Sequence, residues 1–253
     1  MELNLTHHID HLGPDTKEPT ALECIILAGG LGTRLRSEVS DLPKCMAPVG
    51  GKPFLQYLID YLVAQGVTHF IFSVGYMHQS IESFIHNQYP HLHCHFSLEQ
   101  EPLGTGGAIK LAIQYATQAN ILILNGDTLF FAPLKALMQF HHQHDNDCTL
   151  SLKPMKDFDR YGVVEINQHS SIQSFREKQF YSAGLINGGV YALNVVSFRR
   201  IPFPEKFSFE KEYLEKYHAS HKMMGIPLDS YFIDIGIPED YQRAQLELPL
   251  QFS

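Results

Sequence analysis

Near its beginning the chain reads Cys24-Ile25-Ile26-Leu27-Ala28-Gly29-Gly30-Leu31-Gly32-Thr33-Arg34-Leu35, and Pro43-Lys44 follows shortly after. A short apolar strand that runs into a glycine-rich turn is how α/β proteins bring backbone N–H groups against a phosphate chain. Glycine suits positions where backbone touches a ligand, because a Cβ atom would hold the ligand off. Arg34 and Lys44 add positive charge beside the turn. The stretch therefore predicts a cradle for nucleotide phosphates.

This cradle departs from two common phosphate-binding patterns. A Walker A loop closes with Gly-Lys-Ser/Thr, whereas here Gly32 is followed by Thr33-Arg34. The dinucleotide fingerprint has a third glycine where Leu35 stands. Taken alone, a glycine-rich turn that merely closes a strand would be the simpler interpretation, and the neighbouring residues have to decide.

The composition is that of an ordinary globular chain. Its 253 residues suffice for one large α/β domain or two small ones, and 44% of them are hydrophobic. The 19 basic and 27 acidic residues give a net charge of −8, which argues against nucleic acid or an anionic membrane as a partner. No apolar run approaches the length of a membrane span, and the N-terminus lacks the apolar core of a signal peptide. We therefore expect a cytoplasmic protein.

The cysteines and histidines show no clear metal-binding pattern. The four cysteines lack CxxC or zinc spacing and are expected as free thiols: Cys24, Cys45, Cys94 and Cys148. His91, His93 and His95 share one face of a predicted strand, which is formally metal-capable, but apolar residues on the other face favour a simple solvent-exposed side. A second group is likewise expected mostly at the surface: His141, His142 and His144.

Apolar periodicity predicts alternating strands and helices in the first half of the chain. The expected strands are 24–27, 70–74, 92–98 and 121–124, and the expected helices are 53–65, 79–86 and 105–117. Strands that are apolar on both faces are typical of a parallel sheet covered by helices on both sides. From Asp147 onward strands prevail, at 149–153, 162–166, 172–176 and 189–193, with helices at 209–218 and 238–246. No linker separates two domains, and the polar residues 1–20 are expected to form a flexible extension.

The stretch 27–35, together with Pro43-Lys44, closely resembles the signature of the sugar-1-phosphate nucleotidyltransferases, and the resemblance extends from Glu23 to about Leu246. It implies a Rossmann-like α/β fold with a mixed, mainly parallel central sheet and helices on both faces, the nucleotide-diphospho-sugar transferase fold. It also implies a single domain at 21–253. Its nucleotide-binding half would cover about 21–147 and its sugar-phosphate-binding half about 148–253.

The resemblance implies a nucleoside triphosphate bound by the cradle and by a second loop. The implied cradle contacts are Leu27, Ala28, Gly29, Gly30, Gly32, Thr33, Arg34 and Lys44. Residues 99–108, Glu-Gln-Glu-Pro-Leu-Gly-Thr-Gly-Gly-Ala, resemble the base-reading loop of the family, with Gln100, Gly104 and Thr105 as contacts. The Gln100 amide can both donate to and accept from a base edge. Thr105 as a helix N-cap is a structural alternative that is compatible with binding.

Two aspartates are implied as ligands of Mg²⁺. Asn125-Gly126-Asp127 directly follows a predicted buried strand, where open parallel sheets bind ligands, although a turn with a helix-capping aspartate would look the same. The family holds Mg²⁺ with a Gly-Asp carboxylate, which implies Asp127 as metal ligand and nucleotide contact. The block from Tyr231 to Tyr241 resembles the closing block of the family and implies Asp234 as the second ligand. Mg²⁺ accepts one or two carboxylates together with phosphate oxygens and waters.

The acceptor pocket and the reaction also follow from the resemblance. Segments that match the sugar-phosphate pocket of the family imply Gly162, Glu177, Lys178 and Asn187 as its contacts, although Glu177-Lys178 alone would pass for an exposed charge pair. The implied reaction is attack of a sugar 1-phosphate oxygen on the α-phosphorus of the triphosphate, with pyrophosphate leaving. A phosphate monoester has a second pKa of about 6, so the nucleophile needs no general base. The reaction still requires that the two substrates be aligned and that their negative charges be neutralised. The resemblance implies Arg34, Lys44 and Asp127 in these catalytic roles.

Within the family, three stretches look closest to the D-glycero-α-D-manno-heptose 1-phosphate guanylyltransferases: 42–49, 125–130 and 207–212. This implies GTP and a heptose 1-phosphate as substrates for glycan precursor synthesis. Mannose 1-phosphate guanylyltransferases and N-acetylmuramate 1-phosphate uridylyltransferases would share most of the motifs. A non-catalytic sugar-nucleotide-binding regulator should have lost Arg34, Lys44 or one of the two aspartates, and all four are present. A nicotinamide-dependent dehydrogenase is disfavoured because Leu35 stands where its fingerprint has a glycine. The N-terminal extension and the C-terminal helix could each serve a homodimer, but nothing selects that state.

Overall fold

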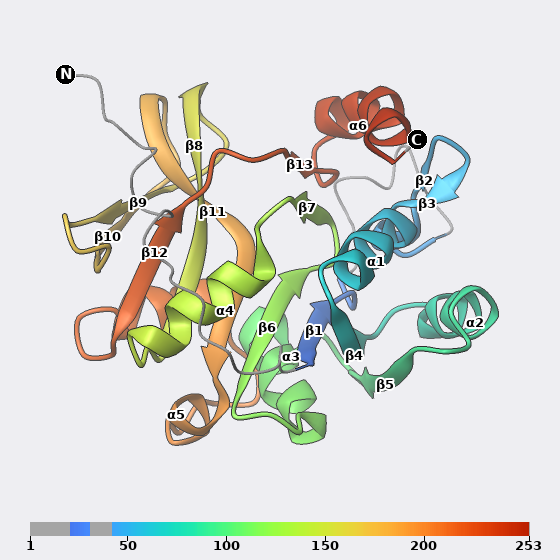
Figure 1. Ribbon diagram of the computed structural model, residues 1–253, viewed down its shortest axis with the longest axis horizontal. Coiled ribbons are helices and arrows are strands. Elements are labelled where there is room, and N and C mark those ends of the chain that lie inside the picture. Colours follow the sequence, from blue (N-terminus) through green and yellow to red (C-terminus); the bar gives the residue numbers. More distant parts are fainter. Residues whose placement is uncertain (1–20, 31–41, 253) are drawn as a thin grey trace.

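The computed structural model describes residues 21–30 and 42–252. The expected extension at 1–20 and the segment 31–41 lie outside the described residues. A nine-stranded mixed sheet forms the centre, in the order β10-β9-β11-β6-β1-β4-β5, with β8 paired to β11 and β12 paired to β8 (Figure 1). This confirms the expected mixed α/β sheet. None of the described helices is long and apolar enough to cross a membrane.

The first half of the chain forms the parallel part of the sheet. Its strands are β1 (Leu22–Leu27), β4 (Val67–Val74), β5 (His93–Leu98) and β6 (Asn120–Asn125), all parallel to their neighbours in this group. Along β1, Cys24 and Ile26 are buried in one apolar cluster and Ile25 in another. The strand is therefore covered on both faces, as its continuous apolar sequence predicted.

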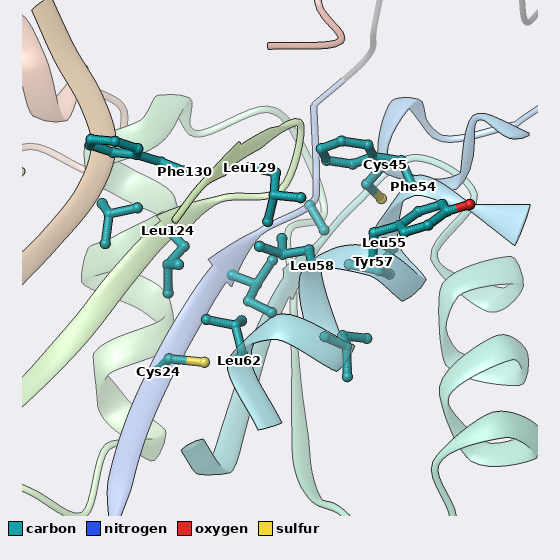
Figure 2. Close-up of a cluster of buried hydrophobic side chains, with 14 of the residues drawn as sticks. Cys24, Cys45, Phe54, Leu55, Tyr57, Leu58, Leu62, Leu124, Leu129 and Phe130 are labelled. Atoms are coloured by element: carbon teal, nitrogen blue, oxygen red, sulfur yellow. The ribbon is translucent and has the colours of Figure 1, made fainter. Parts of the chain in front are cut away.

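Helices form the two covering layers. One layer contains α1 (Phe54–Ala64), α2 (His78–Gln88), α4 (Leu134–Gln143) and α6 (Pro238–Gln251). The other contains α3 (Gly104–Ala112), α5 (Val195–Arg199) and η3 (Phe209–Glu215). Figure 2 shows the first cluster, in which Leu58 and Leu62 of α1 lie among side chains of the sheet such as Leu124. Apolar residues at helical spacing made α1 predictable, and burying them stabilises the layer.

The second half of the chain adds antiparallel strands to the same sheet. They are β8 (Cys148–Phe158), β9 (Val163–Ile166), β10 (Ile172–Arg176) and β11 (Tyr181–Asn194), while β12 (Met223–Pro227) runs parallel to β8. The C-terminal part of β11 pairs with β6, and β11 begins at Tyr181 instead of near the predicted Gly189. Its first residues are exposed or half-buried and lack an apolar run, so the pattern failed to show them.

Several short elements also escaped prediction because they are too short to show a period. These are the 3₁₀ turn η1 (Lys44–Met46) and the strands β2 (Pro48–Val49), β3 (Lys52–Pro53), β7 (Thr128–Phe130) and β13 (Phe232–Asp234). The expected helix 105–117 is instead α3 followed by the 3₁₀ turn η2 (Ile113–Tyr115). The expected helix at 209–218 is largely a π-helix, η3.

One histidine was placed wrongly. His91, His93 and His95 are exposed, as expected, but His141 is buried. Its ring nitrogens lie 2.9 Å from Thr149 Oγ1 and 3.0 Å from Asn120 Oδ1, so the ring joins α4 to β8 and β6. Burial lowers the pKa of His141 to about 4, which keeps the ring neutral. The four cysteines are free thiols; three are buried and Cys94 is half-buried.

Candidate active site

The described part of the glycine-rich turn, residues 27–30, lies where β1 ends. The Ala28 N–H donates to the Ser73 carbonyl at 2.8 Å, and the Gly126 N–H donates to the Leu27 carbonyl at 3.0 Å. A Cβ atom at Gly29 would lie 2.5 Å from Glu99 Oε1, whereas one at Gly30 would meet no atom of the described residues within 4 Å. Gly29 is thus explained by packing, whereas packing against the described residues does not explain Gly30. The predicted contacts Gly32, Thr33 and Arg34 lie outside the described residues.

Lys44, Asp127 and Asp234 form the charged centre of the site. The Lys44 ammonium contacts the Asp127 carboxylate directly and lies 3.9 Å from Asp234 Oδ1. Only 12% of the Lys44 side chain is exposed, so this cation is largely withdrawn from water. Such close, partly desolvated pairs are far less screened than surface ion pairs. Two carboxylates from distant parts of the chain therefore converge on one cation.

Short strands explain how these aspartates meet. β7 follows the turn after β6 and pairs antiparallel with β13, with Thr128 opposite Asp234. Asp127 leads into β7 and not into a helix, so the helix-capping alternative for Asp127 is wrong. Asp234 Oδ1 accepts the Gly236 N–H at 2.7 Å, and a Cβ atom at Gly236 would lie 2.2 Å from Lys44 Nζ. The glycine after Asp234 thus leaves room for the lysine.

Cys45, the residue after Lys44, has an unreactive thiol. The thiol is buried, and burial together with the Asp127 charge raises the pKa of Cys45 to about 12. Because the thiolate is the reactive form, this thiol is not a nucleophile near neutral pH. Cys45 therefore serves packing in the cluster of Figure 2.

A cavity of about 500 Å³ opens beside the charged centre and brings the predicted acceptor residues together. Of the sequence-predicted residues, it is lined by Lys44, Asp127, Gly162, Glu177, Lys178, Asn187 and Asp234. Glu177 and Lys178 are exposed at its wall. The Asn187 side chain is held in place because its amide donates to Tyr191 Oη at 2.8 Å and its Oδ1 accepts the Gly189 N–H at 3.0 Å. A cavity of this size is in the range of small-molecule sites.

The cavity also contains residues that sequence reasoning did not select. Arg176, Ser208, Glu210 and Lys211 line it, on β10 and around the start of η3. Arg176 pairs with Glu165 at 2.5 Å and has a half-exposed side chain. In the sequence, the segment 207–212 stood out only as a subfamily feature. Its place at the cavity depends on how distant elements pack, and hydrophobic periodicity carries no information about that.

The predicted base-reading loop is held between two carboxylates. Glu99 accepts the Leu103 N–H at 3.0 Å and the Ser73 hydroxyl at 3.1 Å, which ties the loop to the end of β4. Gln100 is exposed. Thr105 is not the N-cap, because α3 begins at Gly104 and the Thr105 hydroxyl instead donates to Glu210 at 2.6 Å. Gly104 has a φ of +73°, a left-handed conformation that favours glycine.

The site offers oxygen ligands for a cation but no larger metal cluster. Among residues 21–30 and 42–252, no group of three or more histidine, cysteine, aspartate or glutamate side chains is placed to hold a metal. Two converging carboxylates, with room for phosphate oxygens and waters in the adjoining cavity, are the donor set that Mg²⁺ uses when it binds with a substrate.

Known proteins resemble this chain over most of its length. It is 52% identical to D-glycero-alpha-D-manno-heptose 1-phosphate guanylyltransferase of Aneurinibacillus thermoaerophilus, over 90% of this chain and 98% of that protein. It is 43% identical to the Campylobacter jejuni protein of the same name, over 87% of this chain and 97% of that protein. The crystal structure of HddC from Yersinia pseudotuberculosis superposes with a TM-score of 0.82 at 38% identity, covering 92% of this chain and all of that chain. The Nucleotidyl transferase family matches residues 23–250. This match covers nearly the whole chain and shows that the chain belongs to the nucleotidyl transferase family.

Proposed function

We propose that this enzyme transfers GMP from GTP to D-glycero-α-D-manno-heptose 1-phosphate and releases pyrophosphate. The observation that carries the proposal is the Lys44 ammonium between Asp127 and Asp234, at the junction of the glycine-rich turn and the cavity. Guanine and heptose are supported by the two relatives at 52% and 43% identity, and guanine also by the HddC crystal structure complexed with GMP-PN. The product would be a precursor for surface polysaccharide or another glycan, made in the cytoplasm, where free thiols persist.

In this proposal Asp127 and Asp234 hold Mg²⁺, which neutralises charge on the triphosphate when bound. Lys44, now paired with both carboxylates, would turn to the α-phosphate region. Arg34 would bind the triphosphate and its transition state. Residues 27–30 and 32–33 would present backbone to the phosphates, and Gln100, Gly104 and Thr105 would form the base loop. Because the nucleophile is already ionised, no side chain has to remove a proton.

The acceptor would occupy the cavity. Lys178 would bind its phosphate as a flexible point charge, and the Gly162 backbone, Glu177 and Asn187 would contact the sugar. We expect Lys178→Ala to raise KM for the sugar phosphate about tenfold or more, since a charged hydrogen bond contributes about 1.5–3 kcal/mol. KM for GTP should stay nearly unchanged. Lys206→Ala, at an exposed residue that does not line this cavity, is the matched control.

A substrate panel tests the proposal. The enzyme is incubated with each of the four common NTPs against heptose 1-phosphate, mannose 1-phosphate and N-acetylmuramate 1-phosphate, with Mg²⁺, and pyrophosphate is measured. GTP with the heptose phosphate should give the highest kcat/KM. A higher value for mannose 1-phosphate would reassign the acceptor, which is a relevant outcome because the Hypocrea jecorina mannose-1-phosphate guanyltransferase is 34% identical. Absence of turnover with every pair would contradict the enzyme assignment and favour a regulator.

A further inference from the structure

The base loop and the segment 205–210 are packed together without space between them. A Cβ atom at Gly106 would lie 2.2 Å from the Phe207 ring, and one at Gly107 would lie 2.2 Å from the Glu205 carbonyl oxygen. The Gly106 N–H donates to the Phe207 carbonyl at 3.0 Å, and the Phe207 N–H donates to the Leu103 carbonyl at 3.0 Å. These glycines are therefore explained by contact with a segment a hundred residues away and not by the approach of a nucleotide.

A carboxylate closes this contact on the side of the cavity. Glu210 Oε2 accepts from the Thr105 hydroxyl at 2.6 Å and from the Ser208 hydroxyl at 2.9 Å. The Thr105 hydroxyl in turn accepts the Phe209 N–H at 2.9 Å. Hydrogen bonds to an ionised acceptor are about twice as strong as neutral ones. The Thr105 hydroxyl thus binds the start of η3 both as a hydrogen-bond donor and as an acceptor.

The same carboxylate lines the acceptor cavity. Glu210 and Ser208 both contribute to its wall, so the start of η3 touches both the base loop and the cavity. Glu210 lies in the first turn of the π-helix, a rare geometry that is frequent at functional sites. The hydrogen bonds that join this carboxylate to Thr105 and Ser208 both end on Oε2.

We propose that Glu210 is a positioning residue that couples the two substrates: a sugar phosphate bound in the cavity orders Glu210, and Glu210 orders the base loop through Thr105. The inference rests on the proposed function, since it assumes that Gln100, Gly104 and Thr105 contact the nucleotide. Coupling between two sites is reciprocal, so nucleotide binding must strengthen acceptor binding by the same factor.

Calorimetric titration measures this coupling directly. The probe is α,β-methylene-GTP with Mg²⁺, whose carbon bridge prevents transfer, and its Kd is measured with and without saturating heptose 1-phosphate. In the unmodified enzyme we expect the acceptor to tighten nucleotide binding roughly fivefold or more. Glu210→Ala and Thr105→Val should each bring the factor close to one, and the double variant should add nothing further. Thr105→Ser, which keeps the hydroxyl, should restore it.

The control is Glu212→Gln, which removes a carboxylate of the same helix. Glu212 accepts the Ser208 N–H at 2.7 Å and, within the described residues, forms no hydrogen bond to the base loop. It should retain the coupling factor. Circular dichroism checks that each variant is folded. A coupling factor that survives in Glu210→Ala, or that is near one in the unmodified enzyme, would overturn this inference alone. Failure of the unmodified enzyme to bind the nucleotide at all would instead overturn the proposed function and the inference with it.

Discussion

The half of the chain that we propose binds the nucleotide (about 21–147, the nucleotide half) and the half that we propose binds the acceptor (about 148–253, the acceptor half) share one sheet but are built differently. In the nucleotide half the central strands β1 and β6 are six residues long, are buried between two helix layers, and end together at one edge. In the acceptor half β8 and β11 are 11 and 14 residues long, and each has one buried end and one end that is mostly half-buried or exposed. The cavity is lined by residues of β9, of the end of β10 and of the middle of β11.

Under the proposed function, this difference would let one fold serve two ligands. The phosphates of the nucleotide need fixed backbone groups, and strand ends anchored in a dry core hold such groups rigidly. The acceptor needs side chains that read a sugar and its phosphate, and strands that leave the core place such side chains around a wide cavity. We therefore expect changes at the junction of the halves to affect catalysis, changes in the parallel half to affect stability, and changes in the outer part of the acceptor half to affect stability least.

The largest effect is expected at the junction, where Asp127 meets Lys44. Asp127→Asn should lower the rate of pyrophosphate release by about 10³-fold or more, because in the proposed function Asp127 would hold Mg²⁺, and a metal ion stabilises such a transition state by several kcal/mol. The variant should remain folded, as judged by its urea unfolding midpoint. Asp229→Asn, at a carboxylate that is 79% exposed and paired with Lys153, is the control and should keep normal turnover. Full activity in Asp127→Asn would end the assignment of this residue.

Substitutions of apolar side chains should lower the free energy of unfolding more in the nucleotide half than in the outer part of the acceptor half. Leu122→Ala in β6 removes a fully buried side chain and should cost about 2–5 kcal/mol of unfolding free energy. Leu185→Ala lies in the outer part of β11, where the side chain is only half-buried, and should cost about 1 kcal/mol. Urea denaturation of both variants gives the comparison. Equal losses would show that the outer strands belong to the rigid core after all.

The pH dependence of stability should reveal His141, which bonds to β6 on one side and β8 on the other. Its pKa is about 4 in the folded protein and about 6.5 when unfolded, so the unfolded chain binds more protons between these values. Stability from this group is complete above pH 6.5 and is lost as the pH falls toward 4. The free energy of unfolding is measured at pH 7 and at pH 4.5 for the unmodified protein and for His141→Gln. Between these pH values the unmodified protein should lose roughly 2–3 kcal/mol more than the variant. Parallel losses in both proteins would contradict a neutral, buried ring.

The smallest effect is expected at the glycine-rich turn, where two neighbouring glycines should behave differently. Gly30→Ala meets no atom of residues 21–30 and 42–252 within 4 Å and should leave the unfolding midpoint unchanged, yet raise Kd for the nucleotide about tenfold, or about 1.4 kcal/mol. Gly29→Ala would press on Glu99 and should lower the midpoint itself. If Gly30→Ala binds the nucleotide normally, the nucleotide phosphates lie elsewhere.

Much of the nucleotide half was predictable because its signals are local. A continuous apolar run such as Ile121–Leu124 predicts a buried strand wherever it occurs, and the glycine-rich turn with Lys44 resembles a family signature. The acceptor half was less predictable. The outer part of β11 has no apolar alternation to mark it, and η3 has a helical pattern that did not distinguish a π-helix from an α-helix.

By itself the sequence determined the α/β class, the order of the main elements, the family resemblance and the identity of Lys44, Asp127, Asp234 and Lys178 as candidates. Only the tertiary structure decided that Lys44 lies between the two aspartates, that Gly106 and Gly107 face Phe207, and that Thr105 is bound to Glu210. The physical reason is the range of the interactions. Strand and helix periods arise between near neighbours along the chain, whereas these contacts join residues at least 83 positions apart. Which distant groups meet depends on how the layers pack, and a local pattern carries no information about that.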